Sequence, residues 1–173
     1  MKGNVLVVDD DKAMCELIDT TLTMKGYSTT WCQSATEAND LLHDIEFDVV
    51  LTDIRMPGTT GLQLCQQISS TRPDIPVIVM TAFGTLDTAV ATIRSGAYDF
   101  LTKPVELELL TLTIARAVER RHLKRQIHLL EQQARSENHF GEMLGDSLPM
   151  QHLYDQMKRV STSDASVLIT GES

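Results

Sequence analysis

Short apolar runs alternate along much of the chain with segments whose apolar residues recur every three or four positions. Uninterrupted runs such as Val5-Leu6-Val7-Val8 are typical of strands that are buried on both faces of a sheet. The amphipathic segments between these runs predict helices. Strands are expected over 5–8, 27–32, 48–53, 75–81 and 99–102, and helices over 12–24, 34–44, 62–70 and 86–95 and from Glu106 onward.

Local signals support the ends of several of these helices. Ser34 is a typical N-cap for the second helix, and Gly26 is placed to end the first. The core-facing side of the first helix is expected to carry Ala13, Leu17, Ile18 and Leu22. Five strand–helix units in succession predict an α/β fold with a doubly wound parallel sheet and right-handed crossovers.

Polar residues follow the expected strands at their carboxyl ends, where ligands bind in doubly wound sheets. These residues are Asp9, Asp10, Asp53, Thr81 and Lys103. Three carboxylates in one cleft would repel one another, and a hard divalent cation such as Mg²⁺ relieves that repulsion. Asp53 can act as a nucleophile toward phosphorus, with Lys103 and Thr81 available to bind phosphoryl oxygens. The plainer alternative is that aspartates at strand ends only cap helices, as Asp11 is placed to do.

Four segments, VLVVDDD, LTDIRMPGTTGLQL, VIVMTAFG and GAYDFLTKP, resemble the receiver domain of bacterial two-component response regulators. The resemblance covers roughly residues 1–120 and implies a flavodoxin-like five-stranded sheet of order 2-1-3-4-5. It implies that Asp53 is the phosphoacceptor and that Asp10, Asp53 and the backbone carbonyl of Arg55 bind Mg²⁺ directly. Asp9 would act on the metal through water.

The same resemblance implies a switch. Thr81 would be the switch hydroxyl, Lys103 the phosphate-pairing lysine, and Phe100 the aromatic side chain that changes rotamer with Thr81. Phe100 lacks the hydroxyl of the tyrosine form, and a plain core aromatic is the alternative reading of that position.

The last helical pattern continues beyond the receiver-like region, because 107–134 contains neither Gly nor Pro. A short coiled-coil or dimer seam is predicted from the alternating four- and three-residue spacing of Leu123, Ile127, Leu130 and Ala134. A single amphipathic helix packed on its own domain is the alternative. The basic run consists of Arg120, Arg121, Lys124 and Arg125. It favours a solvated helix face over a nucleic-acid site.

The segment MLGDSLPMQHLYDQMKRVSTSDASVLITGES resembles the start of the AAA+ ATPase domain of sigma-54-dependent activators. In that family such a strand, here 167–170, leads into the Walker A loop, so Gly171 would begin a loop that the sequence does not complete. The expected organisation is a receiver at 1–120, a helical linker at 121–141 and a fragment of the sigma-54-interaction domain at 142–173. This combination is similar to NtrC-type response regulators.

Composition narrows the expected environment. The net charge is −9, and residues 1–120 hold 17 acidic against 9 basic groups, which disfavours a nucleic-acid or anionic-membrane surface there. The start of the chain lacks the features of a signal peptide, no apolar run approaches the length of a membrane span, and the three scattered cysteines suit a reducing compartment. We therefore expect a cytoplasmic protein without a membrane partner.

The functional expectation is a phosphorylation-controlled switch rather than an enzyme in its own right. Its expected partners are a sensor histidine kinase and a second copy of the chain. ATP, sigma-54 RNA polymerase and DNA would be bound only by missing parts of a longer protein. Three alternatives are an aspartate-nucleophile phosphatase built on Asp9-x-Asp11, a stand-alone ATPase, and a phosphate-independent dimer scaffold. The first lacks its further signature residues, and the second lacks the loop lysine.

Overall fold

The computed structural model describes residues 2–82, 86–137, 139–140, 143–145, 147–161, 166 and 168, without the side chains at 86–89, 132–137, 139–140 and 144. The chain divides into two compact units, Met1–Arg125 and Gln126–Ser173. The predicted strand at 167–170 and Gly171 lie outside the described residues, apart from the exposed Leu168.

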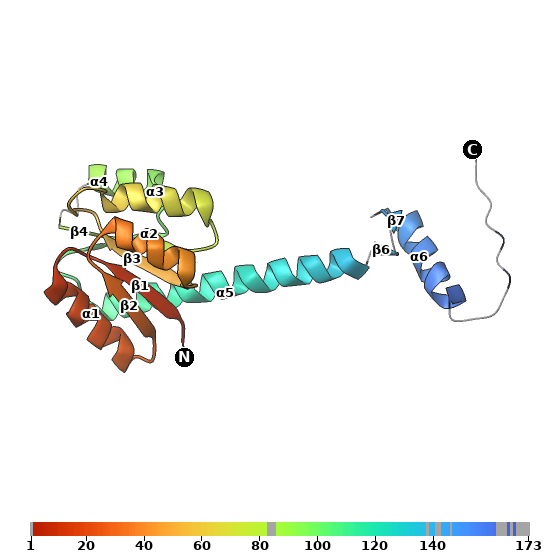
Figure 1. Cartoon of the computed structure of the whole chain (residues 1–173), viewed down its shortest axis with the longest axis horizontal. Helices are drawn as coiled ribbons and strands as arrows, with labels where there is room; N and C mark the ends of the chain where they lie inside the picture. Colours follow the sequence, from red (N-terminus) through yellow and green to blue (C-terminus); the bar gives the residue numbers. More distant parts are fainter. Residues whose placement is uncertain are drawn as a thin grey trace. The chain divides into compact units, whose positions relative to one another are not determined.

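The first unit is built on a parallel sheet of order β2-β1-β3-β4-β5, which confirms the predicted fold class and strand order (Figure 1). Its strands are β1 (Asn4–Val8), β2 (Ser28–Cys32), β3 (Val49–Asp53), β4 (Val77–Thr81) and β5 (Asp99–Thr102). Its helices are α1 (Lys12–Met24), α2 (Ala35–Asp44), α3 (Gly61–Thr71), α4 (Leu86–Arg94) and α5 (Leu107–Glu137), the last of which continues into the second unit.

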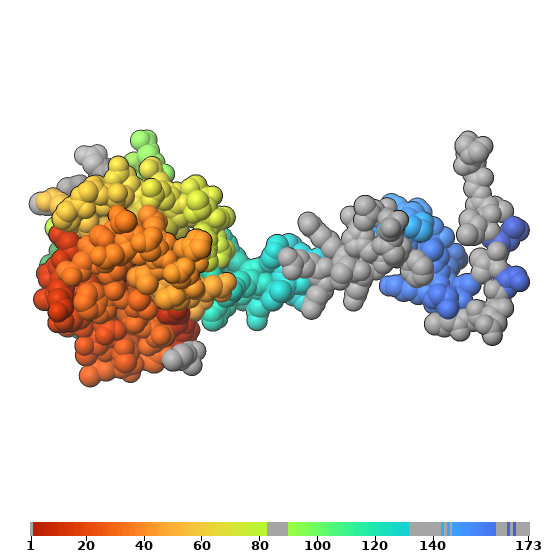
Figure 2. All heavy atoms as spheres, viewed as in Figure 1, coloured from red at the N-terminus to blue at the C-terminus, as the bar shows by residue number. Residues whose placement is uncertain are grey.

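Alternate strand residues face opposite sides of the sheet, so the apolar runs supply two separate cores. Val5 and Val7 of β1 pack with α1 and α5 on one face, whereas Leu6 and Val8 pack with α2 and α3 on the other. On the face shown in Figure 2, atoms coloured from red to yellow-green pack closely together and cover the sheet. The uninterrupted apolar runs are therefore explained by burial on both faces.

The helix ends follow the predicted capping chemistry. The side chain of Asp11 accepts from Ala13 N at the start of α1, and that of Ser34 accepts from Glu37 N at the start of α2. Gly26 adopts a φ of +89° directly after the C-cap of α1, a conformation that favours glycine.

One core prediction was wrong. Ala13 and Leu17 of α1 are exposed, while Cys15 is buried beside Ile18 and Leu22. The buried face of α1 therefore runs through positions 15, 18 and 22. The predicted face, through 13, 17, 18 and 22, is rotated slightly around the helix from the observed one.

In the second unit, β6 (His139–Phe140) pairs antiparallel with β7 (Met143–Leu144), and α6 (Leu148–Ser161) follows. The buried Tyr154 of α6 donates its hydroxyl to Met143 O at 3.2 Å, which ties the helix to β7. Within the described part of the chain, none of the helices combines the length and apolarity that crossing a membrane requires.

Candidate phosphoryl-acceptor site

The site lies at the carboxyl edge of the five-stranded sheet. Asp9 directly follows β1, Asp53 ends β3, Thr81 ends β4 and Lys103 directly follows β5. Because these strands are parallel, their carboxyl ends meet at one edge. The edge is held together by a backbone bond, in which Lys103 N donates to Thr81 O at 2.7 Å. The peptide bond from Lys103 to Pro104 is cis.

Lys103 joins two aspartates from different strands. Its Nζ lies 2.8 Å from Asp9 Oδ2 and 2.7 Å from Asp53 Oδ1. The side chain of Asp9 is 0% exposed and that of Asp53 8%, against 21% for Lys103. Buried carboxylates need such compensation, because removal from water penalises each charge. One ammonium therefore balances two carboxylates, and the group retains a net negative charge.

Burial and pairing shift the pKa values of these groups. Burial raises the pKa of the Asp9 carboxyl, and the hydrogen bonds from Lys103 and the Asp11 N–H only partly oppose that rise. Burial on its own would lower the pKa of Lys103, but hydrogen bonds to Asp53 and Asp9 and their charges outweigh it and raise the pKa. Lys103 is therefore a charged ammonium at neutral pH.

Backbone N–H groups fix the second oxygen of each carboxylate. Arg55 N donates to Asp53 Oδ2 at 2.7 Å, and Asp11 N donates to Asp9 Oδ1 at 3.0 Å. Each aspartate thus receives a bond from the residue two positions ahead and another from Lys103. The oxygens of Asp53 are held in a defined direction at the rim, which is the positioning that phosphoryl transfer requires.

Two of the expected site residues, Asp10 and Phe100, do not belong to the group formed by Asp9, Asp53 and Lys103. Asp10 is exposed, and its backbone carbonyl accepts from Gln33 Nε2 at 3.0 Å. Within the described ranges, no three His, Cys, Asp or Glu side chains are gathered as a metal cluster would be. In the structure Asp9 and Asp53 share the ammonium of Lys103, and Asp10 does not belong to this pair. Phe100 is half-buried in β5, where it is the register partner of Val79.

The donor set nevertheless suits magnesium. Mg²⁺ prefers oxygen ligands and usually binds through one or two carboxylates, with waters and phosphate completing its octahedron. Asp9 and Asp53 supply carboxylate oxygens at one edge, and the backbone of Arg55 already lies against Asp53. Asp10 directly follows Asp9, and its exposed carboxylate stays a predicted third ligand.

Sequence reasoning missed Gly61, the first residue of α3. A Cβ at this position would lie 1.9 Å from the backbone oxygen of Asp53, far inside van der Waals contact. Gly61 N donates to Ile54 O at 3.0 Å, so the start of α3 is tied to the segment that follows β3. The sequence did contain a signal for Gly61. Thr60 already caps the start of α3, and no turn there requires a glycine, so the glycine points to a close approach of another segment.

Arg121 requires a correction, because it does not belong to a solvated face. Its side chain is 2% exposed, and its guanidinium pairs with Asp48 at 3.3 Å and Asp74 at 3.1 Å. Arg125 pairs with Glu46 at the surface. These contacts join the start of the predicted linker to the first unit, which runs to Arg125.

The predicted dimer seam is exposed where it is described. Leu123, Ile127 and Leu130 are each more than half exposed on α5. The side chain of Ala134 lies outside the described residues. Apolar side chains left in water along one helix are available for association.

Comparison with known proteins decides the family. Residues 5–115 match the model of the response regulator receiver domain. The chain belongs to this family. Its relatives are NtrC-type response regulators, and the chain spans only about 37% of the length of curated relatives that it matches.

Two relatives illustrate the similarity. The chain is 39% identical over 172 residues to the response regulator protein PilR of Pseudomonas aeruginosa, covering 99% of this chain and 37% of that protein. It is 37% identical over 176 residues to the DNA-binding transcriptional regulator NtrC of Klebsiella pneumoniae, covering 99% and 36%.

Solved structures show the same likeness. NtrX from Brucella abortus in complex with ATP matches with a TM-score of 0.69 and 33% identity, covering 93% of this chain and 35% of that one. The beryllofluoride-activated NtrC4 receiver domain dimer matches with a TM-score of 0.65 and 37% identity, covering 70% and 99%.

Proposed function

We propose that the first unit accepts a phosphoryl group on Asp53 from a sensor histidine kinase and thereby switches a sigma-54-dependent activator. One observation carries the proposal: the carboxylate of Asp53 lies at the sheet edge with one oxygen on Lys103 and the other on the Arg55 N–H. A carboxylate that served only as a helix cap would need no ion pair with a partly buried lysine from another strand end. Membership of the receiver family supports the same reading.

In this proposal the residues divide the work of the transfer. An oxygen of Asp53 forms a bond to phosphorus as the bond from phosphorus to the donor nitrogen breaks. Lys103, already charged and 2.7 Å from Asp53 Oδ1, balances the charge that arrives. Thr81 is 4% exposed at the end of the neighbouring strand, from which its hydroxyl can bond a phosphoryl oxygen.

A magnesium ion would be held by Asp10, Asp53 and the backbone carbonyl of Arg55, with Asp9 acting through water. When bound, magnesium neutralises negative charge on the carboxylates and the incoming phosphoryl oxygens. The pair of carboxylates balanced by a single ammonium favours this assignment, because the group keeps a net negative charge for a cation.

The proposed switch lies in the neighbouring strands. A bond from Thr81 to phosphate would favour one of two conformations, and Phe100 in β5 and helix α4 would carry the change outward. Moving such an equilibrium from about 1:99 to 99:1 requires a difference of roughly 5.5 kcal/mol in phosphate binding. Several charge-assisted bonds together can supply a difference of this size.

The proposed output is an association controlled by phosphorylation. Residues 121–141 would form the linker, with Leu123, Ile127, Leu130 and Ala134 on its dimer seam, and 142–173 would begin an ATPase domain. The exposed leucines of α5 and a solved receiver dimer of a related protein support a homodimer. ATP, sigma-54 polymerase and DNA would be bound by the part of the relatives' length that this chain does not span.

The test is the intact mass after incubation with acetyl phosphate and magnesium. We expect one added phosphoryl group in the native chain and none in Asp53→Asn. Asp40→Asn, which removes an exposed carboxylate from α2, should behave as the native chain. Removal of magnesium should abolish the adduct. If the folded native chain gains no mass, Asp53 is not an acceptor. A phosphate-independent scaffold that dimerises through the exposed α5 leucines then becomes the better account.

A further inference from the structure

The basic run on α5 separates into two pairs with different surroundings. Arg121 and Arg125 are paired with carboxylates of the loops before β3 and β4. Arg120 and Lys124, one helical turn apart, have no carboxylate within ion-pair distance among the described residues. They lie instead along a cavity in the first unit.

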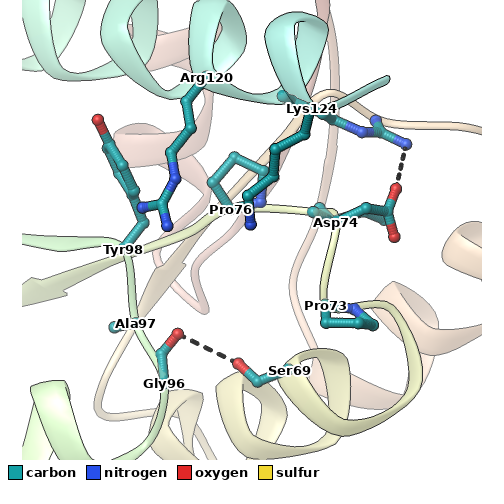
Figure 3. Close-up of a pocket in the computed structure, with 11 residues that line it drawn as sticks. Ser69, Pro73, Asp74, Pro76, Gly96, Ala97, Tyr98, Arg120 and Lys124 are labelled. Carbon is teal, nitrogen blue, oxygen red and sulfur yellow. Dashed lines mark hydrogen bonds and ion pairs between the residues drawn. The ribbon is translucent and has the colours of Figure 1, made fainter. Parts of the chain in front are cut away.

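This cavity lies at the amino edge of the sheet, opposite the phosphoryl-acceptor site. It has a volume of about 230 Å³ and is lined by the end of α3, by 73–76 before β4, by 96–98 before β5, and by α5. Figure 3 shows the side chains of Arg120 and Lys124 extending from α5 toward Pro76, with Tyr98 on one side. Ser69 closes the far side, where its hydroxyl donates to Gly96 O at 3.2 Å (Figure 3).

The charge of the cavity is positive although the chain is acidic overall. Three cations line it, Arg120, Arg121 and Lys124, against one carboxylate, Asp74. Asp74 is already bound by Arg121 at 3.1 Å, and Arg121 also pairs with Asp48 outside the cavity. The charges of Arg120 and Lys124 therefore remain without a counter-ion within the described part of the unit.

Arg120 is held ready for a ligand by Tyr98. Its guanidinium carbon lies 5.0 Å from the centre of the Tyr98 ring. An aromatic face attracts a cation without using up its in-plane N–H donors, because the ring offers no lone pair. The planar fork of arginine then suits the two oxygens of a carboxylate or phosphate, and Lys124 adds a mobile point charge.

The volume limits the size of the ligand. The cavity, at about 230 Å³, is smaller than the pockets of about 300–1,000 Å³ that bury drug-sized ligands, so it suits a small ligand. A phosphate ion or a four-carbon dicarboxylate would fit.

We propose that this cavity is a binding site for a small dianion, a dicarboxylate or a phosphate, held between Arg120 and Lys124. One ligand of charge −2 would neutralise both side chains, and the walls at Pro76 and Tyr98 would shield the interaction from water. The ligand would also fix two side chains on α5 beside Leu123, the first residue of the proposed seam. This site is independent of the phosphoryl chemistry at Asp53.

The test is an NMR titration of the ¹⁵N-labelled 173-residue chain in metal-free buffer, with ionic strength held constant by chloride. Succinate and inorganic phosphate are titrated separately, and succinamide serves as the neutral control. We expect saturable shifts of the amides of Ser69, Gly96, Ala97 and Tyr98, with a Kd of about 1 mM or tighter for at least one dianion. The dianion that binds more tightly identifies the ligand class.

Variants separate the site from general charge. Arg120→Gln with Lys124→Gln should raise the Kd at least tenfold, and each single change should raise it by a smaller factor. Arg116→Gln removes an exposed arginine one turn earlier on α5, outside the cavity lining, and should leave the Kd within twofold. The fluorescence of Trp31, the single tryptophan, checks folding.

Three outcomes would overturn the proposal. Equal binding of succinamide would show an apolar cavity with no need for charge. Shifts confined to the amides around Asp9 and Asp53 would place the anion at the other edge of the sheet. An equal loss in Arg116→Gln would show only the general attraction of α5 for anions.

Discussion

Each edge of the sheet holds a cation between two aspartates, but the two edges use different cations. At the carboxyl edge, Lys103 joins Asp9 and Asp53 and is itself 21% exposed. At the amino edge, Arg121 joins Asp48 and Asp74 and is only 2% exposed. Arginine holds its partners through a rigid fork, whereas the lysine ammonium is a point charge on a flexible stem.

The difference suggests what each cluster does. A lysine that can turn toward a new oxygen suits a site whose charge changes when a phosphoryl group arrives. An enclosed arginine with two fixed partners suits a permanent attachment of α5 to the loops before β3 and β4. Asp48 strengthens that attachment, because its Oδ2 also accepts from Asn4 N at 2.8 Å. The predictions below test whether Lys103 can exchange its partners while Arg121 keeps its own.

The largest effect is expected for Gly61→Ala at the carboxyl edge. The new methyl group would meet the backbone oxygen of Asp53 at 1.9 Å, so either α3 or the end of β3 must move. We expect the free energy of unfolding to fall by roughly 4 kcal/mol, in the range of severe single substitutions. Urea unfolding followed by Trp31 fluorescence measures it.

Gly26→Ala is the matched control for that substitution. Gly26 has a φ of +89° but nothing within 4 Å of a new Cβ. It should therefore lose only about 1 kcal/mol from backbone strain. Similar losses at the two glycines would mean that the close approach at Gly61 is relieved at little cost.

Arg121→Met should be the next most damaging change. Methionine keeps much of the apolar stem but leaves Asp48, largely buried, without its cation. Breaking a buried ion pair costs about 3–5 kcal/mol, and the half-exposed Asp74 reduces this to roughly 3 kcal/mol here. Unfolding in urea gives the value, and magnesium should not restore the loss.

Lys103→Met should cost less, about 2 kcal/mol without magnesium, and should respond to the metal. Asp9 and Asp53 would lose their shared ammonium, but the raised pKa of Asp9 lets that carboxyl take up a proton and relieve the repulsion. Magnesium at a hundred times its Kd would stabilise any chain with an intact site by about 2.7 kcal/mol, so the rescue is the gain of a variant beyond that of the native chain at the same magnesium concentration. We expect this extra gain in Lys103→Met, whose two carboxylates lack their ammonium, and not in Arg121→Met. The contrast between the two edges would be wrong if magnesium restored the stability of Lys103→Met and Arg121→Met equally, or restored that of neither.

Those parts of the site that depend on local pattern and strand order could be predicted from the sequence. Asp9, Asp53, Thr81 and Lys103 could be placed at one edge, since a parallel sheet brings strand ends together. Arg121 could not be placed, because its partners Asp48 and Asp74 lie 73 and 47 residues away along the chain. Gly61 was missed for a similar reason, since the close approach of α3 to Asp53 exists only in the packed fold.

The exposure of Asp10 shows a further limit. Sequence places Asp9 and Asp10 equally well at the end of β1, yet only Asp9 is buried against Lys103. β1 ends at Val8 and Asp10 lies at a bend, so the aspartate next to the strand enters the edge and the following one faces water. Pattern alone identified the pair without assigning a direction to each member.

Arg125→Ala should have the smallest effect and sets the lower end of the comparison. Its partner Glu46 is 65% exposed and Arg125 itself 47% exposed, so water and salt screen the pair. We expect a loss of about 0.5 kcal/mol or less in urea unfolding at low salt, and none in about 0.5 M salt. A loss comparable to that of Arg121→Met would mean that the attachment of α5 is shared along the whole basic run. A negligible loss would mean that Arg121 alone attaches this part of α5 to the loops. Arg120 and Lys124 would then have no part in the attachment and could bind a ligand in the cavity.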